Sequence, residues 1–155
     1  MDRIASFKVN HLKLKKGLYV SRQDEKNGVK VTTFDLRVTT PYLEPVMDNG
    51  AIHTIEHIFA TFLRNSERKE DIVYFGPMGC RTGFYLITFG DLKPQDVLPL
   101  VLSACDFLLN FDGEIMGASK IECGNYLEQN LDMAKYYISR YKNDLLSEKN
   151  FKYKE

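Results

Sequence analysis

Hydrophobic and polar residues alternate between Gly17 and Val38, with a period typical of β-strands. The dipeptide Asn27-Gly28 lies in the middle of this stretch, and both residue types tolerate the positive φ angles of a tight hairpin turn. The pattern therefore predicts a β-hairpin. Two further apolar runs, Ile72 to Phe75 and Phe84 to Phe89, predict strands that are joined by a loop dense in turn residues.

Three other stretches have apolar residues at helical spacing. The first, from Ala51 to Leu63, is apolar around most of its circumference, so we expect it to be largely buried. The segment Asp48-Asn49-Gly50 precedes it and supplies a candidate N-cap. The other two helices are predicted from Pro94 to a stop at Asp112-Gly113, and from a cap at Asn130 or Asp132 to about Leu146.

Hairpin strands mixed with long helices, without regular alternation of single strands and helices, predict the α+β class. In that class helices pack on a mostly antiparallel β-sheet. The chain has 155 residues, the length of one domain, and it contains neither a repeat nor a Pro/Gly-rich linker. We expect a single domain over residues 1–155, with a frayed and solvated tail at about 149–155.

The composition argues against several functional classes. Hydrophobic residues make up 44% and charged residues 27% of the chain, and 21 basic residues balance 21 acidic ones. This profile gives no indication of nucleic-acid or anionic-membrane binding. No apolar stretch approaches the roughly 18 residues of a membrane span, and the N-terminus lacks a secretory signal. Three irregularly spaced cysteines do not predict a disulfide framework, so we expect a cytoplasmic protein with free thiols.

The strongest chemical signal is the run from His53 to His57, which has the order His-x-x-Glu-His. Residues four apart on a helix lie about 5–6 Å from each other, so the two imidazoles can bind one ion. Glu56 is turned toward the same side and is a candidate acid/base. This order is the inverted zinc motif. Two histidines at this spacing can also be a coincidence, but polar side chains inside an apolar helix need a partner, and a metal supplies one.

The three cysteines receive different interpretations. Cys123 lies in a turn beside Gly124 and is a candidate third ligand, which leaves a fourth position open for chemistry. Cys105 lies among leucines in the second predicted helix, and we assign it to the core. Cys80 lies in a glycine-rich loop next to Arg81, a setting that favours an exposed thiolate, so Cys80 is a candidate acid/base or nucleophile.

Two other functions remain open on these residues alone. A metallopeptidase uses the same inverted motif, with a distant glutamate and an attacking water, although such enzymes are much longer and do not need Cys80. A non-catalytic metal-binding domain would fill the fourth position with a protein group, and Glu56 would have no role.

Several blocks of the chain, in this order, resemble the S-ribosylhomocysteine lyase family, LuxS. The blocks are Ser6-Phe7 and His11, Asp35-Leu36-Arg37, the run from His53 to His57, the segment from Pro77 to Tyr85, and the segment from Cys123 to Tyr126. The resemblance implies a fold related to the metallohydrolases of the processing-peptidase type. It also implies that His53, His57 and Cys123 bind one divalent ion per subunit, iron(II) in the native family enzyme, with zinc or cobalt able to replace it.

The resemblance further implies the reaction. The family cleaves S-ribosylhomocysteine to homocysteine and 4,5-dihydroxy-2,3-pentanedione, the precursor of the signal autoinducer-2, and so serves quorum sensing and the activated methyl cycle. The sugar carbonyl moves along the chain through enediolates, and the thiol then leaves by β-elimination. Cys80, as thiolate, and Glu56 are the implied catalytic residues that exchange the protons.

The family forms its active sites between the two subunits of a homodimer. Ser6, His11 and Arg37 match family residues that reach the substrate from the partner chain. Read without the family, these three are an ordinary turn cap, a surface histidine and a residue of a strand salt bridge. The sequence departs from the usual family pattern at three positions, and there it does not predict substrate contacts; these positions are Asn10, Thr33 and Tyr74.

Overall fold

A computed structural model describes residues 2–154 of the chain. Within this range, four strands form one antiparallel sheet in the order β1-β2-β4-β3. The predicted α+β class and antiparallel sheet are confirmed, and each predicted strand is present. The strands are β1 (Gly17–Lys26), β2 (Val29–Arg37), β3 (Ile72–Pro77) and β4 (Gly83–Phe89).

The hairpin between β1 and β2 turns at Asn27 and Gly28, whose φ angles are 53° and 80°. Both angles are positive, as a two-residue turn that follows the twist of its strands requires. The β1–β2 pairing shifts register between Val20 and Arg22, so Ser21 lies in a β-bulge. The turn and the bulge together fix which side chains of this hairpin face the core.

Three helices of more than one turn occur in the described range: α1 (Asn49–Arg64), α2 (Pro94–Leu109) and α3 (Leu131–Ser147). The side chain of Asp48 caps α1 by accepting a hydrogen bond from the backbone N–H of Ala51 at 3.0 Å. Asn130 caps α3 in the same way. Each helix agrees with its sequence-based prediction to within a few residues. Short 3₁₀ helices η1 (Ala5–Phe7) and η2 (Lys69–Asp71) complete the elements.

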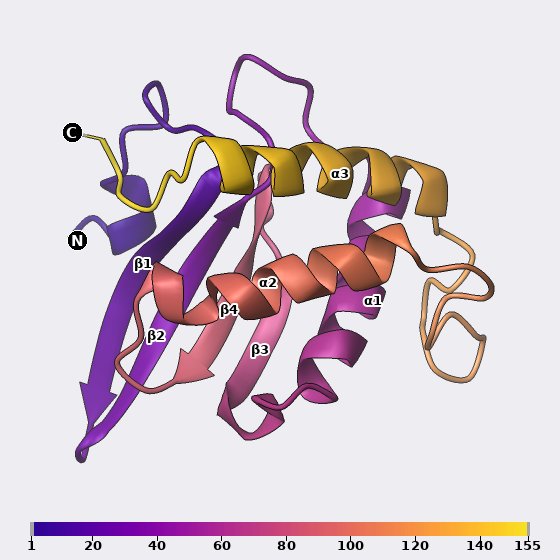
Figure 1. Ribbon diagram of the computed structural model, residues 1–155, viewed down its shortest axis with the longest axis horizontal. Helices are drawn as coiled ribbons and strands as arrows, with labels where there is room; N and C mark the ends of the chain where they lie inside the picture. The colour runs from indigo at the N-terminus through magenta and orange to yellow at the C-terminus, as the bar shows by residue number, and fades with distance from the viewer. Residues whose placement is uncertain (1, 155) are drawn as a thin grey trace.

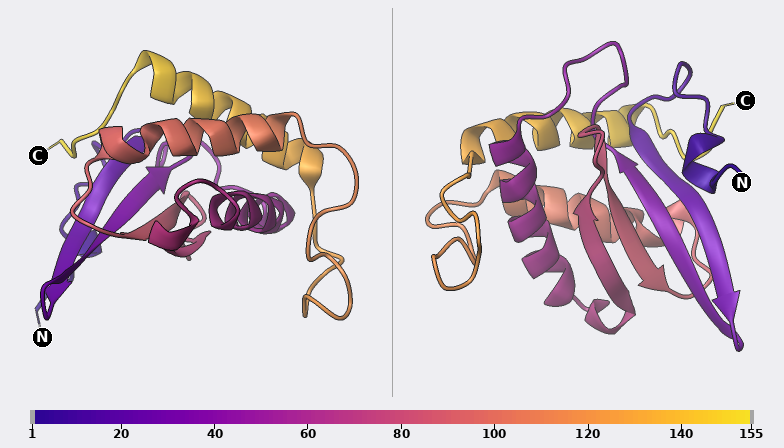
Figure 2. Two further views of the ribbon diagram at one scale, coloured as in Figure 1. Left: turned by 60° about the horizontal axis from the view of Figure 1, so that its bottom comes forward. Right: turned by 180° about the vertical axis from the view of Figure 1, so that it is seen from behind.

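The helices lie on one side of the sheet. Helices α2 and α3 cover one face, and α1 runs beside the edge strand β3 and under both of them (Figures 1 and 2). The core lies between these layers. Side chains along each strand point alternately to the two faces of the sheet, and those that point toward the helices form the core; examples are Phe34 and Leu36 on β2 and Leu86 on β4. The opposite face of the sheet carries none of the three α-helices of residues 2–154 (Figure 2), and we call it the helix-free face; only the single turn η1 lies near it, beside β1.

Polar side chains occupy the helix-free face at the end of the sheet nearest the chain termini. Tyr19 pairs with Asp35, and Asp35 pairs with Tyr85, so the three residues stand side by side across three strands. Arg37 is two residues further along β2 and therefore points to the same face. The strand register thus gathers an acid, a base and two phenols on one surface.

The C-terminal tail contacts β1 and β2 through Asn150 and Tyr153, which the predicted frayed and solvated tail did not anticipate, whereas Lys149, Lys152 and Lys154 are exposed. Glu155 lies outside the described residues. The backbone N–H of Leu18 donates to the carbonyl of Asn150 at 3.0 Å, and the Asn150 side chain donates to the carbonyl of Lys16. The Tyr153 ring stacks on Tyr19 with centroids 4.6 Å apart. Hydrogen bonds to backbone groups at the strand ends and stacking on the Tyr19 ring offset the conformational entropy that the tail loses on ordering, so the tail remains attached.

Among residues 2–154, the structure contains no helix long and apolar enough to cross a membrane.

Candidate metal centre and catalytic pocket

Helix α1 presents His53 and His57 on one face, as the spacing predicts. Their rings meet at 90°, with centroids 4.5 Å apart. The loop between α2 and α3 brings Cys123 to the same point, where its Sγ lies 3.4 Å from Nε2 of His53. One donor atom from each of the three residues lies within 4.8 Å of the others. The structure therefore brings together the three residues proposed as metal ligands.

Backbone carbonyls of the α2–α3 loop hold both imidazoles in place. Nδ1 of His53 lies 2.9 Å from the carbonyl oxygen of Glu128, and Nδ1 of His57 lies 2.7 Å from that of Met116. With the proton on Nδ1, each ring donates to its carbonyl and leaves Nε2 as an acceptor. Metal-binding histidines are commonly fixed in this way, through the nitrogen that does not bind the ion.

The donor set fits a single transition-metal ion. Ligand bonds of about 2.0–2.3 Å in a tetrahedral site separate neighbouring donor atoms by roughly 3.3–3.8 Å, and the Nε2–Sγ distance of 3.4 Å lies in this range. Two imidazoles and one thiolate suit iron(II), cobalt or zinc, and in a tetrahedral site they would leave a fourth position open. The His53–His57–Cys123 group is thus able to hold a metal.

Glu56 lies one residue before His57 on α1 and is half-buried. Its carboxylate makes no hydrogen bond or ion pair with any other residue of the described range. A half-buried carboxylate normally has a partner because desolvation is costly. A carboxylate that has no partner in the described range, and that lies one residue before a proposed metal ligand, is suited to accepting a proton from a substrate.

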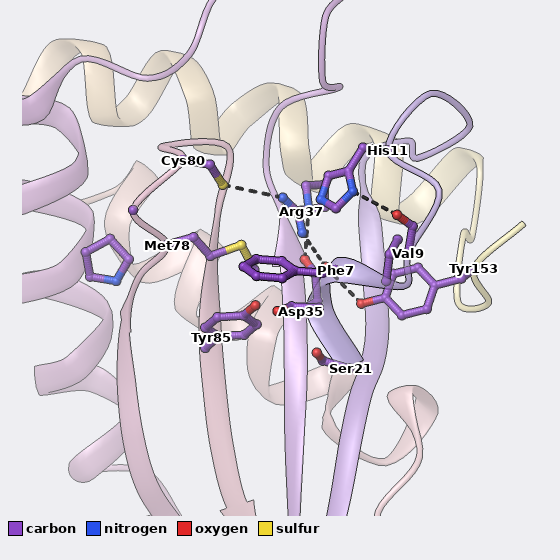
Figure 3. A pocket seen from close by; sticks show the side chains of 13 residues that line it. Phe7, Val9, His11, Ser21, Asp35, Arg37, Met78, Cys80, Tyr85 and Tyr153 are labelled. Carbon is purple, nitrogen blue, oxygen red and sulfur yellow. Dashed lines mark hydrogen bonds and ion pairs between the residues drawn. The ribbon is translucent and has the colours of Figure 1, made fainter. Parts of the chain in front are cut away.

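A pocket of ≈ 310 Å³ opens on the helix-free face (Figure 3). It brings together Cys80 of the β3–β4 loop and the three residues that were expected to contact the substrate. Of these three, Ser6 and His11 come from the N-terminal segment and Arg37 comes from β2. Its lining consists of Ser6, Phe7, Val9, His11, Ser21, Asp35, Arg37, Pro77, Met78, Gly79, Cys80, Tyr85 and Tyr153. The three positions that depart from the family pattern, Asn10, Thr33 and Tyr74, do not line it.

The β3–β4 loop exposes Cys80 at the edge of the pocket. Its Sγ lies 3.1 Å from the hydroxyl of Thr82 and 3.8 Å from Nη1 of Arg37. Nη1 also donates to the Thr82 hydroxyl at 2.6 Å. Since the hydroxyl oxygen already accepts this bond, its own hydrogen is free to point at the sulfur. Two donors and a positive charge therefore face Cys80, and they stabilise a thiolate.

Arg37 forms a buried, two-pronged ion pair with Asp35. Nη2 and Nε donate to the two carboxylate oxygens at 2.6 and 3.1 Å, and the two residues are only 3% and 1% exposed. Burial raises the pKa of the Asp35 carboxyl, and the Arg37 guanidinium and the Tyr153 hydroxyl oppose that rise. The charge of Asp35 in turn holds the pKa of Arg37 above its ordinary value, against the effect of burial. Arg37 is thus one member of a strand ion pair and also lines the pocket.

The metal group and the pocket are separate within one chain. None of His53, Glu56, His57 and Cys123 lines the pocket, and Cys80 is not part of the metal group. Cys105 lies in the core as predicted, fully buried, where desolvation raises the pKa of its thiol to about 12. The two proton carriers proposed from the sequence therefore occupy different sites of the same subunit.

Sequence reasoning missed Asp35 and Tyr153 as parts of the pocket, and Thr82 as a partner of Arg37 and Cys80. Asp35 and Arg37 are two apart on a predicted strand, so their shared face was available as a signal. Thr82 belongs to the β3–β4 loop and Tyr153 to the tail, and the paths of these two segments have no periodic pattern that the sequence could reveal.

The fold and the three donors define an α+β protein with two histidines and one cysteine that together could hold a metal ion. The family described as S-Ribosylhomocysteinase (LuxS) matches residues 4–152, and the chain belongs to this family. It is similar to the S-ribosylhomocysteine lyases of Clostridium beijerinckii, 52% identical over 157 residues and 99% of each chain, and of Borreliella burgdorferi, 54% identical over 156 residues and 99% of each chain. That of Finegoldia magna is 54% identical over 143 residues, covering 92% of this chain and 91% of its own.

Proposed function

We propose that this chain is a carbon–sulfur lyase that cleaves S-ribosylhomocysteine to homocysteine and 4,5-dihydroxy-2,3-pentanedione, the autoinducer-2 precursor. The observation that carries the proposal is the His53–His57–Cys123 group, with Glu56 between its two histidines on α1 and without a partner among residues 2–154, in a chain of the LuxS family. Full-length relatives with more than half of their residues identical carry the name of this activity.

The chemistry needs two bases that act at different carbons. The carbon next to the thioether carbon is not acidic at first, so the sugar carbonyl must move from carbon 1 to carbon 3. Each move takes a proton from one carbon, passes through an enediol, and returns a proton to the neighbouring carbon. Removal of the proton on carbon 4 then expels the sulfur from carbon 5 as a thiolate, which takes up a proton. An ion held by the three donors would supply Lewis-acid polarisation of the sugar oxygens.

Cys80 and Glu56 are our candidates for these two bases. The Cys80 sulfur faces Arg37 and Thr82, both of which favour its thiolate form, so it can remove a proton from carbon and return it. The Glu56 carboxylate has no hydrogen-bond or ion-pair partner within the described range, so it can carry protons between sugar oxygens and carbons. Ser6, His11 and Arg37 surround the same pocket as Cys80 and are proposed to hold the substrate there.

We propose that the resident ion is iron(II), as the family resemblance implies. A cysteine thiolate with two neutral imidazoles is a borderline donor set that accepts iron(II), cobalt or zinc. We place the protein in the cytoplasm, because Cys80, Cys105 and Cys123 are free and the proposed roles of Cys80 and Cys123 require reduced thiols.

A homodimer would join the two halves of the site. In one chain Cys80 lies with Ser6, His11 and Arg37, away from the metal group. We therefore propose that the pocket of one subunit faces the metal group of its partner, so that Cys80 and Glu56 act on one substrate from different subunits. In a two-fold dimer, each such contact occurs twice, which gives two equivalent sites.

Exposed apolar side chains support this association. They occur in the N-terminal segment, in the loop before α1 and in the loop that carries Cys123, and such clusters commonly mark interfaces. The most exposed are Ile4, Phe7, Leu12, Tyr42, Leu43, Ile121 and Leu127, each more than half exposed.

The activity is tested by loading purified protein anaerobically with iron(II) or cobalt and incubating it with S-ribosylhomocysteine. A thiol reagent then reports the homocysteine released. We expect one thiol per substrate consumed, and absence of thiol release from metal-loaded protein would overturn the proposal.

The shared site is tested by mixing two inactive variants, Cys80→Ala and His57→Ala, under conditions that allow subunit exchange. If Cys80 and the metal group serve the same site from different subunits, half of the dimers regain one of their two sites, and activity returns to about a quarter of the wild-type value. If both residues belong to one subunit's site, no mixed dimer contains an intact site. Mixing Cys80→Ala with Arg37→Met is the matched control, because the two lie in one pocket and should not complement.

A further inference from the structure

The C-terminal tail adds a side chain to the catalytic pocket. The Tyr153 hydroxyl donates to Oδ2 of Asp35 at 2.9 Å, and its ring lies almost parallel to Tyr19, at 12°. Tyr153 lies just beyond residues 4–152, over which the family matches. The family assignment therefore gives this residue no role, whereas the structure places it on the wall of the pocket (Figure 3).

Asp35 connects the tail to Arg37. Its Oδ2 accepts hydrogen bonds from both the Tyr153 hydroxyl and Nη2 of Arg37, and its Oδ1 accepts from Nε. Three donors thus hold a carboxylate that is only 1% exposed. A buried carboxylate held by three donors has one orientation, and it fixes the plane of the guanidinium with it.

The orientation of Arg37 decides what reaches the sulfur. One edge of the guanidinium is bound to Asp35, which leaves Nη1 to donate to Thr82 at 2.6 Å and to approach Cys80 Sγ at 3.8 Å. A small rotation of the guanidinium plane would move Nη1 relative to both Thr82 and Cys80, because the guanidinium is one rigid group.

We propose that Tyr153 is a positioning residue for Cys80. By donating to Asp35, it holds the carboxylate that aims Arg37 at the Cys80 sulfur, and it neutralises part of the negative charge that Asp35 places near the thiolate. The catalytic importance of Cys80 rests on the proposed function, but its reactivity as a thiol does not.

Loss of the Tyr153 hydroxyl has a defined direction of effect. The Asp35 carboxylate stays ionised because Arg37 remains paired with it, but it then lacks one donor and draws the guanidinium more strongly. The Asp35 carboxylate then carries more uncompensated negative charge, and Arg37 lies closer to Asp35 and further from Cys80. Each of these two changes weakens the stabilisation of the Cys80 thiolate. Among the described residues, the other titratable groups that line the pocket are His11 from the N-terminal segment and Tyr85 from β4. Arg81, next to Cys80 in the chain, instead donates to the Asn49 side chain at 3.4 Å. The substitution leaves all three in place.

The experiment compares Tyr153→Phe with the wild type in metal-loaded protein. Phenylalanine keeps the ring that stacks on Tyr19 and removes only the hydroxyl. The readout is the rate at which iodoacetamide alkylates Cys80, followed across pH by mass spectrometry of the Cys80 peptide. We expect the midpoint of this profile to move to higher pH, and alkylation near pH 7 to slow by about threefold to tenfold. If the lyase is active, kcat should fall more than KM rises.

Tyr136→Phe is the matched control, because Tyr136 is an exposed tyrosine of α3 that does not line the pocket. Its alkylation profile should match the wild type. A Tyr153→Phe profile that is unchanged or moves to lower pH overturns the proposal. So does an equal shift in both variants. Alkylation needs no substrate, so failure of the lyase assay leaves this test intact.

Discussion

Gly117 lies against the ring of His57: a Cβ at this position would lie 3.3 Å from Nδ1 and 3.5 Å from Cε1. Its φ angle is +70°, in the left-handed region that glycine enters without strain. The preceding residue, Met116, supplies the carbonyl that Nδ1 of His57 contacts at 2.7 Å. The backbone at residues 116–117 therefore fits closely around one proposed metal ligand.

Gly117→Ala should weaken metal binding without removing a ligand. The added methyl group requires the loop or the ring to move by a few tenths of an ångström, and it makes the left-handed backbone cost about 1 kcal/mol. We expect the affinity for cobalt or zinc to fall by about tenfold, measured by competition with a chromophoric chelator. Gly113→Ala is the control, because Gly113 also has a positive φ, +110°, but has no atom within 4 Å of its Cβ position. An equal loss of metal affinity in both variants would mean that backbone strain alone causes the effect.

Substitutions should separate metal ligands from proton carriers. His57→Ala and Cys123→Ala each remove a donor from a three-donor group, so we expect metal content to fall well below one ion per chain, with loss of activity. Cys80→Ala and Glu56→Gln should keep the ion and lose turnover by at least about a hundredfold. Metal analysis and thiol release on the same samples distinguish the two groups. Equal metal loss in all four variants would show that the roles are wrongly assigned.

Arg37→Met should destabilise the fold as well as abolish turnover. It leaves the Asp35 carboxylate, 1% exposed, without its cationic partner. Removing one member of a buried ion pair costs about 3–5 kcal/mol, and urea unfolding measures this change. Arg37→Lys keeps the charge but cannot bind both carboxylate oxygens at once, so its loss of stability should be smaller. A cost below about 1 kcal/mol for Arg37→Met would mean that the pair contributes little.

The buried thiol of Cys105 should make the protein sensitive to alkali. Burial raises the pKa of this thiol from 9.0 to about 12. A thiol that ionises more readily when unfolded stabilises the fold fully below its unfolded pKa, and this contribution is lost as pH rises through the folded value. At about pH 10.5 the loss should be roughly 2 kcal/mol. Cys105→Ala should be the less stable protein at pH 7 in urea unfolding, and its deficit should shrink at alkaline pH. A deficit that is constant with pH would contradict the expectation.

The sequence predicted well those features that depend on neighbouring residues. The hairpin around Asn27-Gly28 and the helix that carries His53 and His57 both follow from local periodicity and capping. The third member of the metal group, Cys123, was predicted because a thiolate is a common metal ligand and Cys123 lies in a turn beside Gly124.

Features that depend on register or on distant packing were not predicted. Arg37 reaches Cys80 because β2 pairs with β4 in a register that places Arg37 opposite Gly83, next to the loop. No pattern within either segment specifies that pairing. The tail was predicted to fray from its polar composition, which gives no sign that Asn150 and Tyr153 contact strand ends more than a hundred positions earlier in the chain.

The pocket is built from both ends of the chain, with Ser6 on one side and Tyr153 on the other, and the two termini lie at the same end of the molecule (Figure 1). A pocket that joins Ser6 to Tyr153 closes a loop containing nearly all of the described chain, and contacts between residues so far apart in sequence are slow to form. We therefore expect the pocket to be among the last parts of the fold to assemble when the unfolded protein refolds.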